Sequence, residues 1–279
     1  MERIQKALEL ARAERAAAAG PDVAAVEPIV VPLASALNDG SARRAGTRAP
    51  EPERLPVDLA GWRARHLVPP DERSSAAHAY RVLRSQLLGW LRGTTHRVVG
   101  VVSASDGEGK SLTAANLALA LAGQVGPQVT LIDLDLRRPS IGALFGVPRG
   151  RVGVEAFLSG SAQIDEIGVS FAGMDRLRIL PATGPVANGP DLLGSPAARQ
   201  LVDSACASPG QPLVIIDMAP VLLSTDFMTL SPLLDGVLVV ATEGRTRRDD
   251  LQRMNELLRR VRVIGGVLNM ASDFERRAY

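Results

Sequence analysis

Residues 99–111 read Val-Gly-Val-Val-Ser-Ala-Ser-Asp-Gly-Glu-Gly-Lys-Ser, and this stretch decides the fold. The pattern predicts an apolar strand over 96–103, a glycine-bearing loop, and an alanine- and leucine-rich helix over 111–124. Gly107 and Gly109 can adopt positive φ, which lets backbone N–H groups approach an anion closely. The positive end of the following helix points at the same place. This order predicts a phosphate-binding loop.

Two side chains at the end of the loop suit a nucleotide. Lys110 would reach the β- and γ-phosphates, and the Ser111 hydroxyl would bind Mg²⁺. Lys110 is one of only two lysines among 32 basic residues, which suggests a site where arginine would not fit. Ala104 stands where the usual pattern has glycine, so a surface turn that contains Gly-Lys-Ser by chance is the alternative. The candidate nucleotide-binding residues are Asp106, Gly107, Glu108, Gly109, Lys110, Ser111 and Leu112.

Aspartates end two further predicted strands. Asp133 and Asp135 close the strand over 128–134, and Asp217 closes the strand over 212–217. Ligands of open α/β sheets bind outside the carboxyl ends of the strands. A carboxylate buried there is costly without a cation, which makes Mg²⁺ a natural companion. The alternative for each aspartate is to cap the helix that follows its strand.

The rest of the chain continues the alternation of strands and helices. The strand predicted over 261–269 ends in Asn269, which could bind the edge of adenine or simply form a turn. Near-continuous apolar strands separated by helices predict a doubly wound α/β domain with a mainly parallel sheet. Further strands are expected over 177–181 and 235–241, and helices over 71–91, 197–207 and 248–260.

The N-terminal part has a different composition. We expect an N-terminal helix over 1–19, a flexible linker over 20–70 rich in Pro, Ala, Arg and Gly, and a P-loop domain over 71–279. Trp62 could anchor the linker or be loosely ordered. The chain shows neither a signal segment nor an apolar run of membrane-spanning length, so we expect a cytoplasmic protein. The net charge of +2 gives no argument for nucleic-acid binding.

The combined motifs resemble the bacterial tyrosine kinases of exopolysaccharide and capsule assembly. The resemblance covers about 71–279, and its most specific part is Asp-Leu-Asp-Leu-Arg-Arg-Pro at 133–139. Residues 79–84 resemble the helix that joins subunits of this family into a ring. Residues 188–193 resemble its Asn-Pro-x-Glu-Leu-Leu turn, and Asp226 also falls where the family has an aspartate.

Membership would imply phosphorylation by Mg·ATP of tyrosines near the C-terminus, usually on a neighbouring subunit. It would also imply a membrane-embedded polysaccharide co-polymerase as activator, which would hold the kinase at the inner face of the membrane. The resemblance gives Lys110 to the phosphates, and Ser111, Asp135 and Asp217 to Mg²⁺. Asp133 would be the base for the tyrosine hydroxyl. Arg137 and Arg138 would bind the transferring phosphate or a neighbouring subunit, or be solvated loop residues.

Three departures from the family pattern stand out. His78 occupies the place of a glutamate in the interface helix, which puts ring assembly in question. Met218-Ala219 replaces the usual Thr-Pro after the third aspartate. The tail lacks a tyrosine cluster, so Tyr279 is the expected phosphoacceptor, and the other tyrosine, Tyr80, is expected to pack inside its helix.

Two other functions compete with the kinase. One is a nucleotide-binding scaffold that regulates polysaccharide export without phosphorylating anything. The other is an ATPase switch of the related group that positions cargo at membranes or on DNA. That group usually has an additional lysine early in the phosphate loop, where this chain has Ser105.

Overall fold

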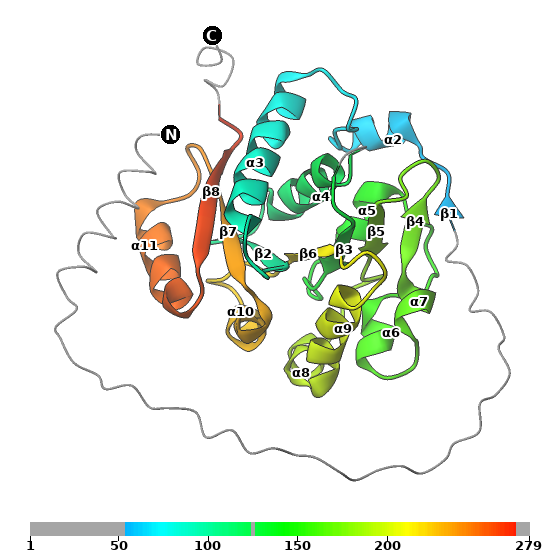
Figure 1. The fold of residues 1–279 in the computed structure, drawn as a ribbon. Coiled ribbons are helices and arrows are strands. Elements are labelled where there is room, and N and C mark those ends of the chain that lie inside the picture. Colours follow the sequence, from blue (N-terminus) through cyan, green and yellow to red (C-terminus); the bar gives the residue numbers. More distant parts are fainter. Residues whose placement is uncertain (1–53, 124–125, 272–279) are drawn as a thin grey trace, which may run out of the picture. The chain divides into compact units, whose positions relative to one another are not determined.

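The computed structural model describes residues 54–123 and 126–271. These residues form one sheet with the strand order β1-β4-β5-β3-β6-β2-β7-β8 (Figure 1). All neighbouring strands are parallel except β4 and β5. The strands are β1 (Arg54–Leu55), β2 (Val98–Ser103), β3 (Val129–Asp133), β4 (Val169–Phe171), β5 (Leu177–Leu180), β6 (Leu213–Asp217), β7 (Gly236–Thr242) and β8 (Val263–Asn269).

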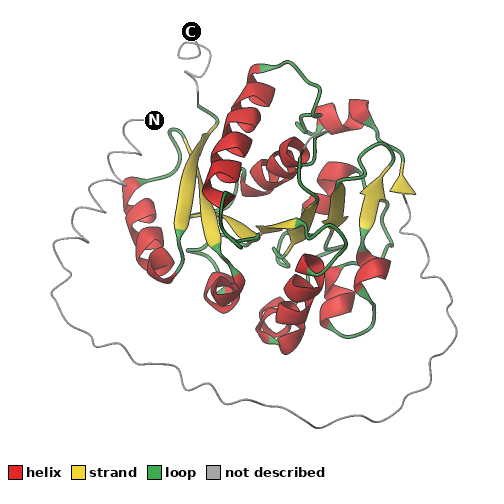
Figure 2. Cartoon of the chain, in the orientation of Figure 1, coloured by secondary structure: helices red, strands yellow, loops and turns green. Residues whose placement is uncertain are grey.

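Helices cover both faces of this sheet (Figures 1 and 2). On one face lie α2 (Leu59–Ala64), α3 (Ser75–Leu91), α4 (Lys110–Leu121) and α5 (Ile141–Phe145). On the other lie α6 (Val154–Leu158), α7 (Ile164–Ile167), α8 (Gly189–Gly194), α9 (Pro196–Cys206), α10 (Asp226–Leu230) and α11 (Arg248–Leu257). Two short 3₁₀ helices, η1 (Ser231–Leu233) and η2 (Leu258–Arg260), follow α10 and α11. The doubly wound, mainly parallel fold predicted from the sequence is confirmed.

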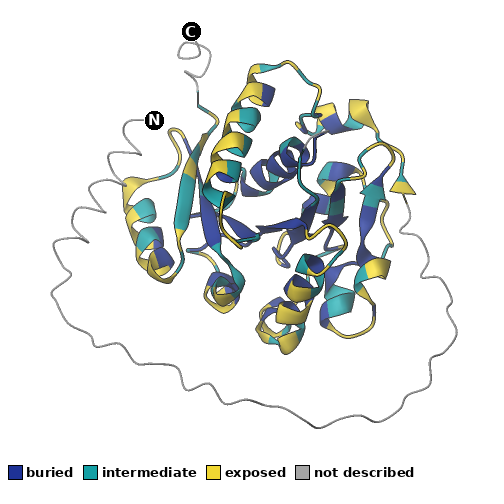
Figure 3. Cartoon of the chain, viewed as in Figure 1, coloured by how far each residue is buried: buried dark blue, intermediate teal, exposed yellow. Residues whose placement is uncertain are grey.

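The central strands are apolar because both of their faces are covered. Every residue of β2, β3 and β6 is buried, and the side chains contribute to two separate apolar clusters, one on each face. Figure 3 shows the central strands as a buried layer, whereas the edge strands and most of the helices carry exposed residues. Burial on both faces explains why these strands appear in the sequence as continuous apolar runs rather than as alternating patterns.

The long elements lie where the sequence patterns predict them, within a few residues. The exceptions are short: β1, β4, α2, α5, α6, α7, α8 and α10 have at most six residues each and were not expected. An element of this length spans less than two helical turns, so it shows no clear period in the sequence. The structure describes no helix that is long and apolar enough to cross a membrane.

The predicted linker over 20–70 ends earlier than expected. Its last part, residues 54–70, forms β1 and α2 and packs on the domain. Trp62 is fully buried, its indole N–H donates to the Phe145 carbonyl at 3.0 Å, and its ring lies edge-on to Phe145 and Phe171. A large apolar ring with a satisfied N–H holds this segment in place, whatever its Pro-rich surroundings. The predicted helix over 1–19 and residues 20–53 lie outside the described residues.

Helix α3 carries the residues expected at a subunit interface. Ser74 caps the helix by accepting a hydrogen bond from Ala77 N at 3.2 Å. Tyr80 is half-buried and faces Asn116 and Thr113 of α4, and burial raises the pKa of its phenol. Its predicted packing role is thereby confirmed. His78 is exposed, and ring assembly stays a prediction.

Candidate active site

The phosphate loop leads from β2 into α4, as predicted. Gly107 and Gly109 have φ values of 72° and 83°, a region that residues with a side chain seldom adopt. A Cβ atom on Gly109 would lie 2.0 Å from the side-chain nitrogen of Asn269, so a larger residue here would be strained and would displace Asn269. Gly109 also begins α4 without a side-chain cap. The first N–H groups of this helix are therefore available to an anion.

The second half of the loop is fastened to the ends of β7 and β8. The Glu108 carbonyl accepts hydrogen bonds from the Thr242 hydroxyl and from Asn269 Nδ2, both at 3.1 Å. The buried Glu108 carboxylate accepts from Ser105 N at 3.1 Å and from the Thr246 hydroxyl. These contacts fix the conformation of the phosphate loop. Asn269 is therefore a support of the phosphate loop, a contact that neither alternative for this residue included.

Sequence analysis missed Thr242, Arg245 and Thr246. The Arg245 guanidinium lies where a Cβ atom of residue 107 would point, and it donates to the Gly107 carbonyl at 3.3 Å. The only available signal was their position, directly after the predicted strand over 235–241 and so at the carboxyl edge of the sheet. Polar residues at such an edge have many possible uses, and only the tertiary structure shows that these three face the loop.

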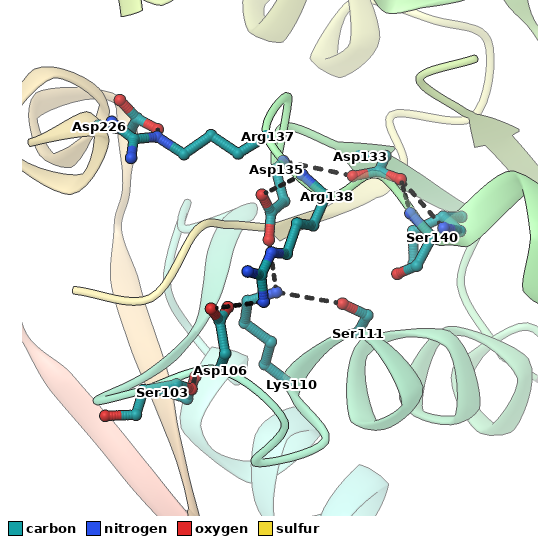
Figure 4. Close-up of polar contacts among 12 residues, drawn as sticks. Ser103, Asp106, Lys110, Ser111, Asp133, Asp135, Arg137, Arg138, Ser140 and Asp226 are labelled. Carbon is teal, nitrogen blue, oxygen red and sulfur yellow. Dashed lines mark hydrogen bonds and ion pairs between the residues drawn. The ribbon is translucent and has the colours of Figure 1, made fainter. Parts of the chain in front are cut away.

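Lys110 joins the phosphate loop to the loop after β3. Its ammonium donates to Asp135 Oδ2 at 2.6 Å and to the Ser111 hydroxyl at 3.3 Å (Figure 4). Burial alone would lower the pKa of Lys110, but the carboxylates of Asp217 and Asp135 raise it above its usual value. Lys110 is therefore a permanent positive charge at the bottom of the site.

Asp133 and Asp217 lie opposite each other on the neighbouring strands β3 and β6. Asp133 Oδ2 accepts hydrogen bonds from the N–H groups of Ser140 and Ile141, each at 3.0 Å, and Oδ1 accepts from Asp135 N at 3.3 Å. Asp133 thus makes the helix-capping contact that was the alternative to a catalytic role, because Ile141 begins α5. Burial, followed by the charge of Asp217, raises the pKa of Asp133 well above its usual value.

Asp217 is the buried carboxylate that most needs a cation. Its side chain is completely buried, and neither oxygen has a hydrogen bond of normal geometry within the described residues. Burial raises the pKa of Asp217 to about 6, although the charge of Lys110 and the nearby Ser111 hydroxyl lower it. A carboxylate left without donors beside a serine hydroxyl fits a Mg²⁺ ligand.

The described residues contain no group of three His, Cys, Asp or Glu that would hold a metal alone. Mg²⁺ does not need one, since it is usually held by one or two carboxylates together with water and phosphate oxygens. Ser111, Asp135 and Asp217 meet at the end of the phosphate loop and would supply such a partial set. These three residues therefore fit the ion in combination with a nucleotide.

A cleft of about 390 Å³ opens beside the phosphate loop. Arg137 and Arg138 line it, and apolar residues form its other walls. Asp135 reaches the cleft, whereas Asp133 does not. The complete lining is Asp106, Asp135, Arg137, Arg138, Val186, Ala187, Pro190, Pro220, Leu223 and Ser224.

The remaining predicted residues have these positions. Leu112 packs its side chain into the apolar cluster under α4, so only its backbone is near the loop. Asp106 forms an ion pair with Arg138 at 2.7 Å. Met218 and Ala219, which replace the family's Thr-Pro, are buried in the core. Tyr279, the predicted phosphoacceptor, lies outside the described residues.

Comparison with known proteins agrees with this geometry. A family model of the ParA group, described as the NUBPL iron-transfer P-loop NTPase, matches residues 94–277. The fold and the loop thus define the class of protein, a P-loop NTPase.

Relatives narrow this class. The tyrosine-protein kinase YwqD of Bacillus subtilis is 31% identical over 202 residues, which are 71% of this chain and 83% of that protein. The kinase domain of the Escherichia coli tyrosine kinase ETK has a TM-score of 0.62 and 26% identity, covering 70% of this chain and 77% of that one. The chain belongs to the family of bacterial tyrosine-protein kinases, which confirms the resemblance seen in the sequence.

One further relative is much longer than the matched region. The succinoglycan biosynthesis transport protein ExoP of Rhizobium meliloti is 34% identical over 204 residues. The match covers 71% of this chain and 25% of ExoP. This chain therefore corresponds to about a quarter of that protein.

Proposed function

We propose that the chain transfers the γ-phosphoryl group of Mg·ATP to tyrosine hydroxyls, including its own Tyr279 in a neighbouring copy, and thereby regulates polysaccharide export. One observation carries the proposal. A phosphate loop, a buried lysine and a buried carboxylate without hydrogen-bond donors meet at one sheet edge, beside an open cleft. A scaffold that only bound nucleotide would not need the cleft next to the phosphates.

The residues divide the work as follows. Lys110 neutralises the phosphate oxygens, and the N–H groups after Gly109 bind them. Ser111, Asp135 and Asp217 would hold Mg²⁺. ATP supplies the phosphoryl group, and Mg²⁺ neutralises the charge that develops as it transfers. Most of the rate would come from this positioning and charge neutralisation.

Asp133 and Asp135 are the two candidates for the base that takes the proton of the acceptor hydroxyl. Both oxygens of Asp133 already accept backbone N–H groups, and its side chain has no exposed surface. Asp135 is 1% exposed, and its two oxygens accept from Lys110 and from Arg138 N. Because a base must come within hydrogen-bond distance of the proton it removes, either carboxylate has to exchange a present donor for the hydroxyl. Asp135 is also a proposed ligand of Mg²⁺, so Asp133 stays the predicted base.

The cleft suits an aromatic acceptor. Val186, Pro190, Pro220 and Leu223 provide apolar surface for a phenol ring, and Asp135 belongs to the same lining. Tyr279 is the expected acceptor of this chain, because Tyr80 packs against α4 and would have to leave its helix surface.

The cellular setting is inferred from the relatives. ExoP carries a region similar to this chain within a transport protein for succinoglycan synthesis. We infer that this chain works with a membrane-embedded polysaccharide co-polymerase that activates it and holds it at the cytoplasmic face of the membrane.

The test is phosphotyrosine formation by purified protein in Mg·ATP, with and without a fragment of the candidate membrane partner. We expect signal in wild type and Tyr80→Phe, and none in Lys110→Met or Tyr279→Phe. Signal lost in Tyr80→Phe and kept in Tyr279→Phe would move the acceptor. ATP binding without phosphotyrosine in any sample would favour the regulatory scaffold. ATP turnover without phosphotyrosine would favour the ATPase switch.

A further inference from the structure

Two neighbouring arginines follow Asp135, and their side chains run in different directions (Figure 4). Arg137 turns toward α10, where its Nε lies 3.7 Å from Asp226 Oδ2 and its Nη1 is 3.4 Å from the Leu223 carbonyl. Arg138 turns toward the phosphate loop, where its Nη1 lies 2.7 Å from Asp106 Oδ2. Both line the cleft, but only Arg138 spans the two loops that surround the predicted phosphates.

The backbone of Arg138 is held close to Lys110 through Asp135. Arg138 N donates to Asp135 Oδ1 at 3.0 Å, while Lys110 binds the other oxygen of the same carboxylate at 2.6 Å. The Arg138 side chain then reaches Asp106, so it links the loop of Asp135 to the phosphate loop that carries Lys110 (Figure 4). A phosphate group bound by Lys110 would therefore be within reach of Arg138.

The two arginines differ in what it costs them to leave their carboxylates. The Arg138 side chain is 72% exposed and that of Asp106 is 35% exposed, so water can solvate both when they separate. Asp226 is 1% exposed, and neither of its oxygens has a hydrogen bond within the described residues. If Arg137 moved away, a buried carboxylate would lose its nearest cation. Arg138 can exchange its partner cheaply, and Arg137 cannot.

Asp106 precedes Gly107 in the phosphate loop, so the guanidinium paired with it already lies at the loop that would bind the phosphates. A terminal phosphate carries more negative charge than this single carboxylate and competes with it for Arg138. Arg138 neutralises the charge of Asp106 in the structure and can form two parallel hydrogen bonds to phosphate oxygens. Arg138 also lines the cleft proposed for the acceptor, where the phosphate to be transferred would have to lie.

We propose that Arg138 is the arginine that recognises the terminal phosphate of the nucleotide: it exchanges Asp106 for the γ-phosphate and so distinguishes ATP from ADP. Arg137 is a positioning residue that holds α10 against the cleft. The proposal rests on the proposed function, because it needs a nucleotide at the phosphate loop.

Calorimetric titration with Mg²⁺ and either ADP or the non-hydrolysable β,γ-imido analogue of ATP tests this without any turnover. In Arg138→Ala we expect binding of the ATP analogue to weaken about tenfold or more, as for loss of a charge-assisted hydrogen bond, and binding of ADP to change by less than about threefold. Arg138→Lys should recover part of the loss. Arg137→Lys is the matched control and should leave the ratio of the two affinities at the wild-type value.

The outcomes separate the two claims. If Arg138→Ala weakens both nucleotides equally, or neither, the proposal fails while the nucleotide site stands. If Arg137→Lys changes the ratio as much as Arg138→Ala does, the assignment between the two arginines is wrong. If wild type binds neither nucleotide, the proposed function fails, and the role of Arg138 fails with it. Thermal unfolding of each variant confirms that a change in affinity does not reflect a loss of folded protein.

Discussion

Two ion pairs of similar length connect the phosphate loop and the loop after β3, and they differ strongly in how exposed they are. Lys110 and Asp135 are 2.6 Å apart, with side chains 10% and 1% exposed. Arg138 and Asp106 are 2.7 Å apart, with side chains 72% and 35% exposed. The distances are similar, but the free-energy cost of separating the two pairs differs greatly. A buried charge that loses its partner cannot be solvated, whereas an exposed charge can.

The difference suggests different tasks. The inner pair, Lys110 and Asp135, lies next to two more buried carboxylates, Asp133 and Asp217. One lysine therefore balances three aspartates. Such an excess of negative charge is costly in the nucleotide-free protein and favourable for binding a cation. In the outer pair, Arg138 and Asp106, one positive charge faces one negative charge, and the two side chains can separate at little cost in free energy. The inner pair builds the site, and the outer pair can respond to what binds there.

Breaking the inner pair should have the largest effect. Lys110→Met should reduce tyrosine phosphorylation by about 10²–10³-fold or more, because it removes the main cation for the phosphates. It should also lower the free energy of unfolding by about 3–5 kcal/mol, since Asp135 remains buried without its partner. Phosphotyrosine blots and urea denaturation measure the two effects.

The double variant Lys110→Met/Asp135→Asn separates the effect on activity from the effect on stability. It should recover most of the lost stability, because both charges are gone, and none of the activity. A double variant as unstable as Lys110→Met would mean that Lys110 stabilises the fold through the packing of its side chain and not through its ion pair with Asp135.

Removing the excess inner charge should stabilise the protein. The pKa of Asp217 is about 6 in the folded protein against 3.8 for a free carboxyl, so the folded state is penalised once this group ionises. Asp217→Asn should therefore raise the free energy of unfolding at pH 7.5 by about 3 kcal/mol, which is about two pKa units. The gain should shrink as the pH falls from 6 toward 4, where wild type is also neutral at this position. Urea denaturation at several pH values checks this, and a gain that does not change with pH would exclude the charge as its cause.

Arg137 and Asp226 provide an intermediate case. Their atoms lie 3.7 Å apart, with one partner buried and the other half-exposed. Arg137→Ala should lower the free energy of unfolding by about 1–3 kcal/mol, because Asp226 loses its only nearby cation within the described residues. Adding Asp226→Asn should restore most of this loss. A change as small as that expected for the outer pair would show that water already reaches Asp226.

The inner pair belongs to the part of the molecule that the sequence predicts well. The phosphate loop and the aspartates follow long apolar strands, and parallel strands bring their carboxyl ends to one edge. Short-range pattern and topology are enough to place Lys110, Asp135 and Asp217 together. The same argument could not show which donors each aspartate accepts. Asp133 accepts from the N–H groups of Ser140 and Ile141, and Asp135 accepts from Lys110 and Arg138 N.

The outer pair shows where the sequence is insufficient. Arg137 and Arg138 are identical neighbours, and nothing in their order indicates that one turns to α10 and the other to the phosphate loop. The directions follow from the turn after Asp135 and from the positions of Asp106 and Asp226, which are distant in sequence. Trp62 is a similar case, because its segment has the composition of a linker and is held by a pocket that Phe145 and Phe171 create.

Asp106→Asn tests the outer pair itself and should have the smallest effect. We expect the free energy of unfolding to fall by less than about 1 kcal/mol, because both side chains become solvated when they separate. At 1 M salt, where the screening length falls to about 3 Å, the difference from wild type should become smaller. Urea denaturation at low and high salt measures it, with Asp175→Asn, the partner of the exposed Arg54 at 2.5 Å, as a matched surface control. A loss well above that of the control would mean that Arg138 is bound firmly to Asp106. The exchange of Asp106 for a phosphate would then no longer be cheap, and Arg138 would belong with Lys110 among the fixed parts of the site.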